Sequence, residues 1–237
     1  MSVLLLQLAG PLQSWGSSSR FARRSTENAP TKSGLIGLLA AAQGRSRADD
    51  LGDLAGLRFG VRADQPGVRV RDFQTAHHAD TGEAMPVSER FYLADAVFLA
   101  AFEGDGALLE ELYEALNAPV YLPYLGRRSC PPARSIPLGV REGALECVLD
   151  DHLWLAAQWY QEKRKHEPEV ELGAWIDVRE GETAHHELRD LPLSFAPEHR
   201  RYAMRGLEYI RVTVANPQGA PRPPAPAHDP MAALGGE

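Results

Sequence analysis

Apolar residues fall into short runs along the chain, and their spacing predicts alternating strands and helices. Residues 3–8 form a compact apolar run typical of a buried central strand. Residues 57–64 alternate apolar and polar side chains with the period of a half-buried strand, and residues 96–102 form another buried run. Residues 35–43 follow candidate N-caps at Thr31 and Ser33 and are closed by Gly44, which predicts a helix, and residues 107–116 have the spacing of an amphipathic helix. The first half of the chain therefore predicts a mixture of strands and helices.

A second alternating stretch predicts a hairpin inserted between these elements. Residues 68–73 alternate, residues 75–89 are polar and rich in turn formers, and residues 90–93 resume a strand pattern. A short strand over residues 136–140 completes the order strand, helix, strand, hairpin, strand, helix, strand. This order is typical of an α+β fold, namely a ferredoxin-like or RRM-like unit over residues 1–140.

The remaining residues predict a smaller lobe and a tail. Residues 153–165 have a helical pattern, and residues 170–178 and 207–214 have strand patterns, so we expect a smaller β-rich lobe over residues 141–215. Residues 216–237 contain six prolines and almost no large apolar side chains. Such a segment cannot offset its ordering entropy, and we expect it to be disordered.

The charge of the chain is distributed unevenly. The net charge is -7, but residues 1–141 hold 15 basic and 15 acidic residues, whereas residues 142–237 hold 10 and 17. Residues 1–47 contain a basic island that includes Arg23 and Arg24, and a second island covers residues 115–141. The acidic total therefore does not exclude a nucleic-acid partner for the first part of the chain.

Composition limits the class of protein and its compartment. Hydrophobic residues make up 44% and charged residues 24% of the chain, and no apolar run is long enough to span a membrane. The N-terminus lacks the pattern of a signal peptide, which predicts a cytoplasmic protein. Cys130 and Cys147 have no redox or metal-ligand spacing. We therefore expect no disulfide, no metal and no cofactor.

Two segments near the N-terminus contain candidate binding groups. The loop after the first strand carries Gln13 and Trp15 beside glycines, and an indole can stack on a base. Lys32, Ser33 and Gly34 begin a helix, where free amides and a lysine suit a phosphate. Both segments have a structural alternative, in which Trp15 is a core residue and Gly34 only permits close packing.

A third candidate is the stiff loop over residues 121–131. Its prolines and glycine constrain a backbone that presents adjacent arginines, a hydroxyl and tyrosines, a set suited to the RNA backbone and unstacked bases. The candidate residues of this loop are Tyr124, Gly126, Arg127, Arg128, Ser129 and Cys130. Paired arginines on a solvated surface are the structural alternative.

Four segments together resemble a known family. They are residues 8–16 (LAGPLQSWG), 32–39 (KSGLIGLL), 71–75 (RDFQT) and 124–131 (YLGRRSCP), in this order and spacing. The sequence thereby resembles the CasD family of the type I-E CRISPR Cascade complex. The resemblance covers about the first 135 residues, and later residues resemble the family only loosely, around 191–196 and 205–211.

The resemblance implies an RNA-binding subunit that is not an enzyme. It implies a RAMP-superfamily protein with an RRM-like core, a thumb hairpin at about residues 74–92, and a hold on the five-prime handle of the crRNA in antiviral defense. It also implies contacts with the CasC backbone subunit and the CasA large subunit, and with target DNA only indirectly. The residues expected to bind RNA are Gln13, Trp15, Lys32, Ser33, Gly34, Arg71, Gln74, Thr75, His77, Tyr124, Gly126, Arg127, Arg128, Ser129 and Cys130.

Two other functions remain open from the sequence. A metal-independent endoribonuclease that processes CRISPR repeat RNA could use His77 and His78 as acid and base. Lys32 is the only lysine before residue 163, so a catalytic Tyr-Lys-His set at credible spacing is missing. A ferredoxin-like protein that binds a small acidic ligand is the third hypothesis.

Overall fold

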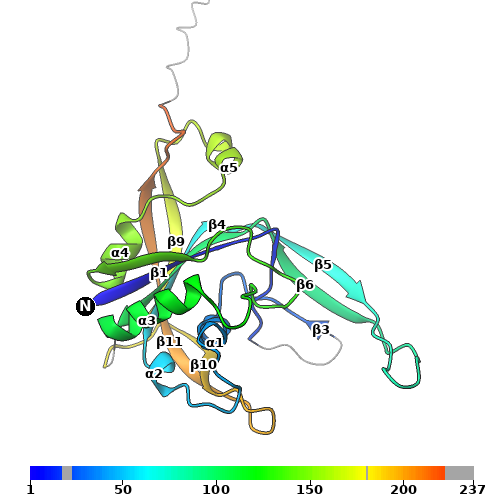
Figure 1. Ribbon diagram of the computed structural model, residues 1–237. Coiled ribbons are helices and arrows are strands. Elements are labelled where there is room, and N and C mark those ends of the chain that lie inside the picture. The colour runs from blue at the N-terminus through cyan, green and yellow to red at the C-terminus, as the bar shows by residue number, and fades with distance from the viewer. Residues whose placement is uncertain (18–22, 180, 222–237) are drawn as a thin grey trace, which may run out of the picture.

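The chain is built around one antiparallel sheet. A computed structural model describes residues 1–17, 23–179 and 181–221. β1 (Ser2–Ala9) lies between β7 (Val97–Gly104) and β8 (Pro137–Glu142), and β4 (Arg58–Gln65) pairs with the other edge of β7. The fold is a mixed α/β structure dominated by antiparallel strands, and the strands predicted from apolar runs are present (Figure 1).

Helices cover both faces of this sheet. Leu4, Leu6 and Leu8 of β1 pack in one apolar cluster with α1 (Lys32–Ala42) and α3 (Gly106–Asn117). Val3 and Leu5 point to the opposite face, where α4 (Leu145–Asp151) lies. Because side chains alternate across a strand, a strand covered on both faces is apolar throughout. This explains the uninterrupted apolar run at residues 3–8. The short α2 (Gly52–Ala55) lies next to α1.

The chain after residue 141 extends the same sheet. β9 (Glu169–Asp177) pairs with β4, and β11 (Arg201–Ala215) and β10 (His186–Ser194) follow, which gives the order β10-β11-β9-β4-β7-β1-β8. The sequence patterns missed β10 and α4. The strands expected in a separate lobe thus share a sheet with the first half, and a division into two lobes at residue 140 stays a prediction.

The predicted helix over residues 153–165 is shorter than expected. α5 covers only Gln158–Lys163. The guanidinium of the buried Arg62 accounts for this, because it donates to the carbonyl oxygens of His152 and Leu153 at 2.8 and 3.0 Å. Carbonyl groups bound in this way hold the backbone before α5 outside a helix.

The tail begins with ordered contacts. Asn216 is buried, and its side-chain amide donates to the carbonyl oxygens of Gln161 and Arg164 at 3.3 and 2.9 Å. The amide of Ala220 donates to the carbonyl of Lys165 at 2.8 Å. The disorder predicted from residue 216 onward therefore does not extend to residues 216–221, and residues 222–237 lie outside the described part of the chain.

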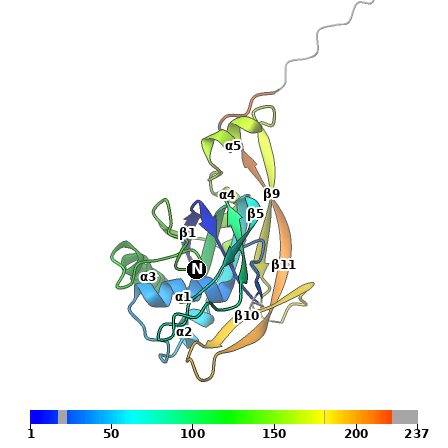
Figure 2. The ribbon, with the colours of Figure 1, turned by 90° about the vertical axis from the view of Figure 1, so that its right-hand side faces the viewer.

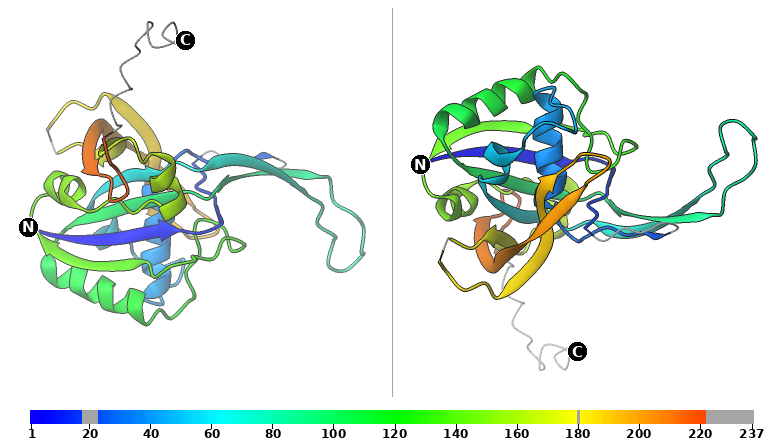
Figure 3. Two further views of the ribbon diagram at one scale, coloured as in Figure 1. Left: turned by 90° about the horizontal axis from the view of Figure 1, so that it is seen from above. Right: turned by 90° about the horizontal axis from the view of Figure 1, so that it is seen from below.

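A two-stranded hairpin projects from the body. β5 (Val68–Gln74) and β6 (Ser88–Ala94) pair antiparallel from Val68↔Ala94 to Gln74↔Ser88. They lie where the sequence predicted a hairpin, and Figure 3 shows them extending away from the sheet. β2 (Leu12–Gln13) pairs antiparallel with the base of β6, at Leu93 and Ala94, and β3 (Arg23–Arg24) pairs parallel with its outer half, at Glu89 and Arg90. The hairpin is therefore fixed to the body at one end only.

Candidate nucleic-acid interface

Arginines from separate segments gather where the hairpin joins the body. We call this surface the hairpin root, and it comprises Arg23, Arg24, Arg69, Arg71, Arg90, Arg127 and Arg128. Arg127 connects two of these segments, because its Nη2 donates to the carbonyl of Arg24 at 2.8 Å. Within the described residues, only Arg71 of this set forms an ion pair, with Glu89 at 3.6 Å, and its side chain is 54% exposed. The hairpin root therefore carries positive charge that the protein's own acids leave largely unneutralised.

Aromatic rings hold several of these guanidinium groups in place. Arg23 lies over the ring of Phe91, with the guanidinium carbon 5.3 Å from the centroid. Arg127 lies over Tyr92 and Arg71 over Phe73, each at 4.7 Å. Such contacts orient a guanidinium without consuming its N–H donors. The donors of these groups that make no contact within the protein stay available for phosphate oxygens or base edges.

The hairpin root has two faces. Arg71 and Phe91 are directly opposite each other in the β5–β6 register, so both side chains lie on the same face of the hairpin, the face on which Arg23 covers Phe91. Tyr92 follows Phe91 on β6 and therefore points to the other face, where Arg127 lies over it. Arg71 and Arg127 are thus brought to the same region but to opposite faces of the hairpin. The sequence did not predict this separation.

The loop with the adjacent arginines has a constrained backbone. Gly126 has a φ of +84°, and a Cβ at this position would lie 1.8 Å from the carbonyl oxygen of Ser14. The amide of Leu125 donates to the carbonyl of Cys130 at 2.7 Å, and the amide of Cys130 donates to the carbonyl of Arg127 at 2.8 Å. The sequence therefore needs glycine at residue 126 to seat this loop against the segment after β2.

Inside this loop, Arg127 has an unused donor. Its Nη1 is buried and has no hydrogen-bond partner among the described residues, and the same holds for Nε of Arg90. Arg128 and Ser129 are exposed, as is Tyr124, which is 42% accessible. Cys130 is fully buried, and its burial raises the pKa of the thiol. Arg127 and Arg90 therefore each keep one buried N–H that the described part of the protein does not satisfy.

Residues farther along the hairpin lie near its exposed end. Gln74 is half-buried, and its side-chain amide donates to Asp72 at 3.1 Å. Thr75 and His77 are exposed, and His77 forms an isolated bridge with Ala84. These side chains follow Arg71 in the chain but lie beyond the hairpin root. Contact with them requires a ligand that extends along the hairpin.

Gln13 and Trp15 lie in the core, which corrects their place in the predicted contact surface. Trp15 is 1% exposed and Gln13 is fully buried. The indole N–H of Trp15 donates to Oε1 of Gln13 at 3.0 Å, and Nε2 of Gln13 donates to the carbonyl of Ala96 at 2.7 Å. No face of the indole is open to a base, so the core alternative describes Trp15, whose role is to support the loop.

The predicted phosphate cradle at the start of α1 is filled by the protein itself, a second correction. The amide of Lys32 donates to a carboxylate oxygen of Asp190 at 2.7 Å, and its Nζ is 3.0 Å from Asp177. Burial lowers the pKa of Lys32, while Asp177 opposes the shift. Ser33 is half-buried, and Gly34 leaves room for Trp15, whose ring would lie 3.0 Å from an added Cβ. Asp190 occupies the place that a phosphate would take.

Arg205 joins this group into a buried network. Its guanidinium pairs with Asp177 and, at 2.7 Å, with Asp190. The side chains of Lys32, Asp177, Asp190 and Arg205 are all less than a tenth exposed. Two cations and two carboxylates balance, and the network ties α1 to the strands after residue 141. Its role is structural, and no sequence spacing pointed to it.

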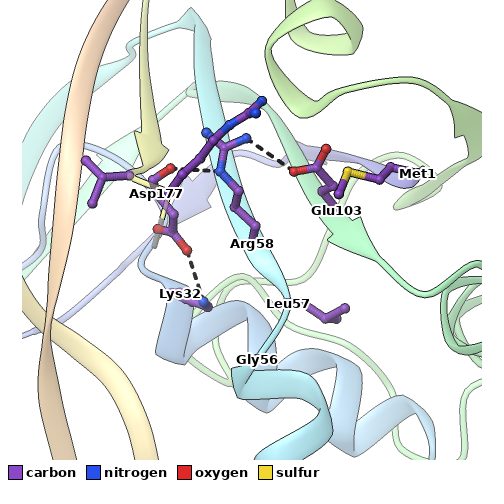
Figure 4. A pocket seen from close by; sticks show the side chains of 9 residues that line it. Met1, Lys32, Gly56, Leu57, Arg58, Glu103 and Asp177 are labelled. Atoms are coloured by element: carbon purple, nitrogen blue, oxygen red, sulfur yellow. Dashed lines mark hydrogen bonds and ion pairs between the residues drawn. The ribbon is translucent and has the colours of Figure 1, made fainter. Parts of the chain in front are cut away.

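A cavity of about 390 Å³ opens beside this network. Figure 4 shows Lys32, Arg58, Glu103 and Asp177 among its lining residues. Arg58 is 3.2 Å from Glu103 and 2.7 Å from Glu146. The hydrogen bond from Arg58 lowers the pKa of Glu146 to about 2. Because the charges of this cavity neutralise one another, it offers a charged ligand no free partner.

The sequence did not single out Arg69, Arg90, Phe91 and Tyr92 as members of the site. Arg23 and Arg24 were visible only as part of a basic island. The aromatic pattern of β6 was the available signal, but nothing in it showed that β3 would pair with that strand. The pairing depends on tertiary structure.

The described part of the chain contains neither a membrane-spanning helix nor a cluster of metal-ligating side chains. Among the described helices, none is long and apolar enough to cross a membrane. Over the same part of the chain, no group of three or more His, Cys, Asp or Glu side chains is arranged to hold a metal ion. Cys130 and Cys147 are free thiols.

Comparison with known proteins identifies the family. A model of the family "CRISPR-associated protein (Cas_Cas5)" matches residues 3–208. The "CRISPR system Cascade subunit CasD" of Escherichia coli (strain K12) is 37% identical over 159 residues, which are 58% of this chain and 70% of the relative.

Solved structures agree. A chain from a "CRISPR RNA-guided surveillance complex" has a TM-score of 0.75 and 34% identity, over 98% of this chain and 97% of that one. A chain from a "Crystal structure of Cas protein" has a TM-score of 0.69 and 37% sequence identity, over 94% of this chain and 100% of that one. The resemblance seen in the sequence motifs is thereby confirmed. The chain belongs to the Cas_Cas5 family of CRISPR-associated proteins, the family that includes the CasD subunit of type I-E Cascade.

Proposed function

We propose that this chain holds the five-prime handle of the guide RNA within Cascade, in the cytoplasm. In this role it binds RNA without cutting it, caps the backbone filament beside CasC and contacts CasA. Target DNA meets it only through the guide duplex. The observation that carries the proposal is the hairpin root, where arginines from β3, β5, β6 and the loop before β8 lie together and only Arg71 is paired with an acid, among the described residues.

Unpaired arginines favour a polyanionic ligand over a small acidic one. They occupy two faces of the hairpin, and Phe91 and Tyr92 orient some of them. A single small anion cannot contact both faces, whereas an RNA strand can pass around the root. RNA phosphates accept the charge, and exposed aromatic side chains such as Tyr124 and Phe73 can contact bases.

The topology supports a ferredoxin-like or RRM-like core of the RAMP type. The segment β8-β1-β7-β4 of the sheet has the strand order of that fold, with α1 and α3 in one apolar cluster with β1. The β5–β6 hairpin is inserted between β4 and β7, and it supports the assignment of residues 74–92 to a thumb. A hairpin fixed at one end can reach along the guide RNA beyond the root.

The positions of the basic residues favour binding over catalysis. Lys32 is buried against Asp177, away from His77 and His78 on the projecting hairpin. The ring of His78 also accepts hydrogen bonds from the amides of Asp80 and Thr81, each at 3.3 Å. A general acid and base of a nuclease must converge on one phosphate. These groups are not assembled in that way.

The binding assay is a salt titration with fluorescently labelled handle RNA. Each phosphate contact contributes a log–log slope of about 0.7, so Arg127→Ala should weaken binding and lower the slope by about that amount. Arg211→Ala is the matched control, because Arg211 is exposed on β11 and is paired with Glu171 at 2.9 Å. Equal effects of both substitutions would contradict the proposed site.

Arg71→Ala tests whether RNA uses both faces of the hairpin. If the strand wraps around the root, Arg71→Ala and Arg127→Ala each lower the salt slope and their effects add. If only one of them acts, the RNA lies on that face alone.

The nuclease alternative is tested with intact repeat RNA in EDTA. We expect the RNA to be bound and to stay uncut over hours, because binding does not require the acid and base groups to converge. Cleavage that is lost in His77→Ala would establish the alternative instead.

A further inference from the structure

A short loop after α3 exposes large apolar side chains. We call it the apolar loop, and it comprises Val120, Tyr121, Leu122 and Pro123. Leu122 is 85% exposed, Val120 64% and Tyr121 59%. A single exposed leucine is ordinary, but several consecutive large apolar side chains exposed on a folded protein indicate an interaction site. Leu122 is at the centre of this group.

The backbone of the apolar loop is tied to the body. The amide of Val120 donates to the carbonyl of Ala42 at 2.9 Å, and the amide of Tyr121 donates to that of Ala41 at 3.3 Å. Both carbonyl groups belong to the last turn of α1, and that of Ala41 also accepts from the amide of Gly44 at 3.0 Å. The side chain of Val120 also lies against Gly44, which has a φ of +79°. The apolar side chains are therefore presented by a braced loop.

The charge of this segment distinguishes it from the RNA site. Residues 115–126 contain no charged side chain, and Arg127 and Arg128 follow immediately. Leu122 and Val120 have no hydrogen-bond donor or charge that could bind a phosphate and no aromatic ring that could stack on a base. A protein surface that is apolar and uncharged is the complement of this loop. Figure 3 shows the loop between α3 and β8 reaching toward the base of the hairpin, so such a surface would lie beside the RNA.

We propose that Leu122 and Tyr121 insert into an uncharged, apolar pocket of a protein subunit that lies next to the guide RNA. This inference rests on the proposed function, because the arginines of the same loop place the RNA there. A second copy of this chain fits less well. A symmetric contact would bring Arg127 and Arg128 of both copies together, and like charges repel. One loop thus joins a protein contact to an RNA contact.

The experiment is reconstitution of the complex from purified subunits and guide RNA. The amount of the Leu122→Glu variant that is incorporated into the complex is compared with that of the unsubstituted chain. The affinity of each isolated chain for handle RNA is measured separately. Leu153→Glu is the matched control, because Leu153 is 75% exposed and lies outside this loop. Melting temperatures show that each variant folds. Leu122→Ala is a milder second variant.

We expect Leu122→Glu to join on the order of tenfold more weakly, with unchanged RNA affinity, because an interface anchor contributes strongly. Leu122→Ala should show a smaller defect, and Leu153→Glu none. Normal joining by Leu122→Glu would overturn the inference, as would an equal defect in Leu153→Glu. Loss of RNA affinity in Leu122→Glu would mean that the loop contacts RNA instead.

Two further outcomes separate this inference from others. Self-association of the isolated chain that Leu122→Glu abolishes would assign the loop to a second copy and overturn the inference. If the unsubstituted chain binds no handle RNA, the proposed function fails. A joining defect confined to the Leu122 variants would still support the protein contact in that case.

Discussion

Substitutions in the buried network should lower stability and leave RNA binding intact. Lys32 contacts Asp177 and, through its amide, Asp190, whereas the guanidinium of Arg205 contacts both carboxylates. Removing one partner of a buried ion pair costs about 3–5 kcal/mol of unfolding free energy, because the other charge stays buried. Arg205→Met removes the shared cation and should cost this full amount.

Lys32→Met should cost less than Arg205→Met. After the substitution, Asp177 still accepts hydrogen bonds from Arg205 and from the amide of Phe59 at 3.0 Å. The lowered pKa of Lys32 shows that burial already opposes its charge, and the substitution removes that cost. We therefore expect a loss of about 1–3 kcal/mol for Lys32→Met. The order of the two variants tests the geometry more sharply than either value.

Urea unfolding and the RNA salt titration provide the two measurements. Both variants should unfold at lower urea with an unchanged m-value, and the folded protein should keep the salt slope of the unsubstituted chain. The reasoning is refuted if Lys32→Met leaves the unfolding midpoint unchanged and lowers the salt slope by about 0.7. That result would mean that Lys32 binds a phosphate, as its position in the sequence first indicated.

Three other substitutions test the buried Trp15, the backbone at Gly126 and the ion pair between Arg58 and Glu146. Trp15→Ala should cost about 3–5 kcal/mol of stability and leave RNA affinity per folded molecule unchanged. Trp159→Ala is the control, because Trp159 is exposed. Reduced RNA affinity at unchanged stability would instead mean that the indole of Trp15 stacks on a base. Gly126→Ala should disrupt the loop that carries Arg127 and Arg128 and weaken RNA binding, because a Cβ would lie 1.8 Å from the Ser14 carbonyl oxygen. Gly82→Ala, at a φ of +71° in open space, should only cost about 1–2 kcal/mol of stability. Equal RNA affinities of the two variants would contradict the role of this loop. Glu146, with a pKa lowered from 4.5 to about 2 by Arg58, contributes stability above pH 4.5 that is lost as the pH falls toward 2. Solvent screening limits this contribution to about 1 kcal/mol, so Glu146→Gln should flatten the acid part of the stability curve by that amount, and an unchanged curve would mean that Arg58 does not hold the carboxylate.

The sequence predicted elements well where local pattern determines them. β1, β7 and α3 follow apolar runs that are buried as the pattern requires. It missed β10, in which Asp190 and Pro192 interrupt the alternation. Asp190 is fully buried because Arg205 neutralises it, and that pairing exists only after β10 and β11 come together. A pattern based on polarity cannot recognise a buried carboxylate whose partner is remote.

In the candidate site, too, local sequence predicted some residues correctly and misplaced those whose position depends on tertiary contacts. Arg127 and Arg128 were predicted from the residues around them, and the structure places them at the hairpin root. Lys32 and Trp15 were misplaced because a helix start and an indole beside glycines have the same local appearance whether they face a ligand or the core. The contacts that decide between these positions, Lys32 with Asp177 and Trp15 with Gln13, are properties of the folded chain.

The acidic total of the chain is compatible with an RNA site because the excess of acidic residues lies in residues 142–237, which contribute none of the arginines of the hairpin root. Asp177 and Asp190 belong to the acidic second part, but both are held by Lys32 and Arg205. Glu103 and Glu146 are likewise occupied by Arg58. Charges paired at short distance produce little field at the hairpin root, since the fields of the two partners largely cancel and salt screens the remainder. The unpaired arginines therefore set the local potential that an RNA strand meets, and the net charge of -7 does not describe it.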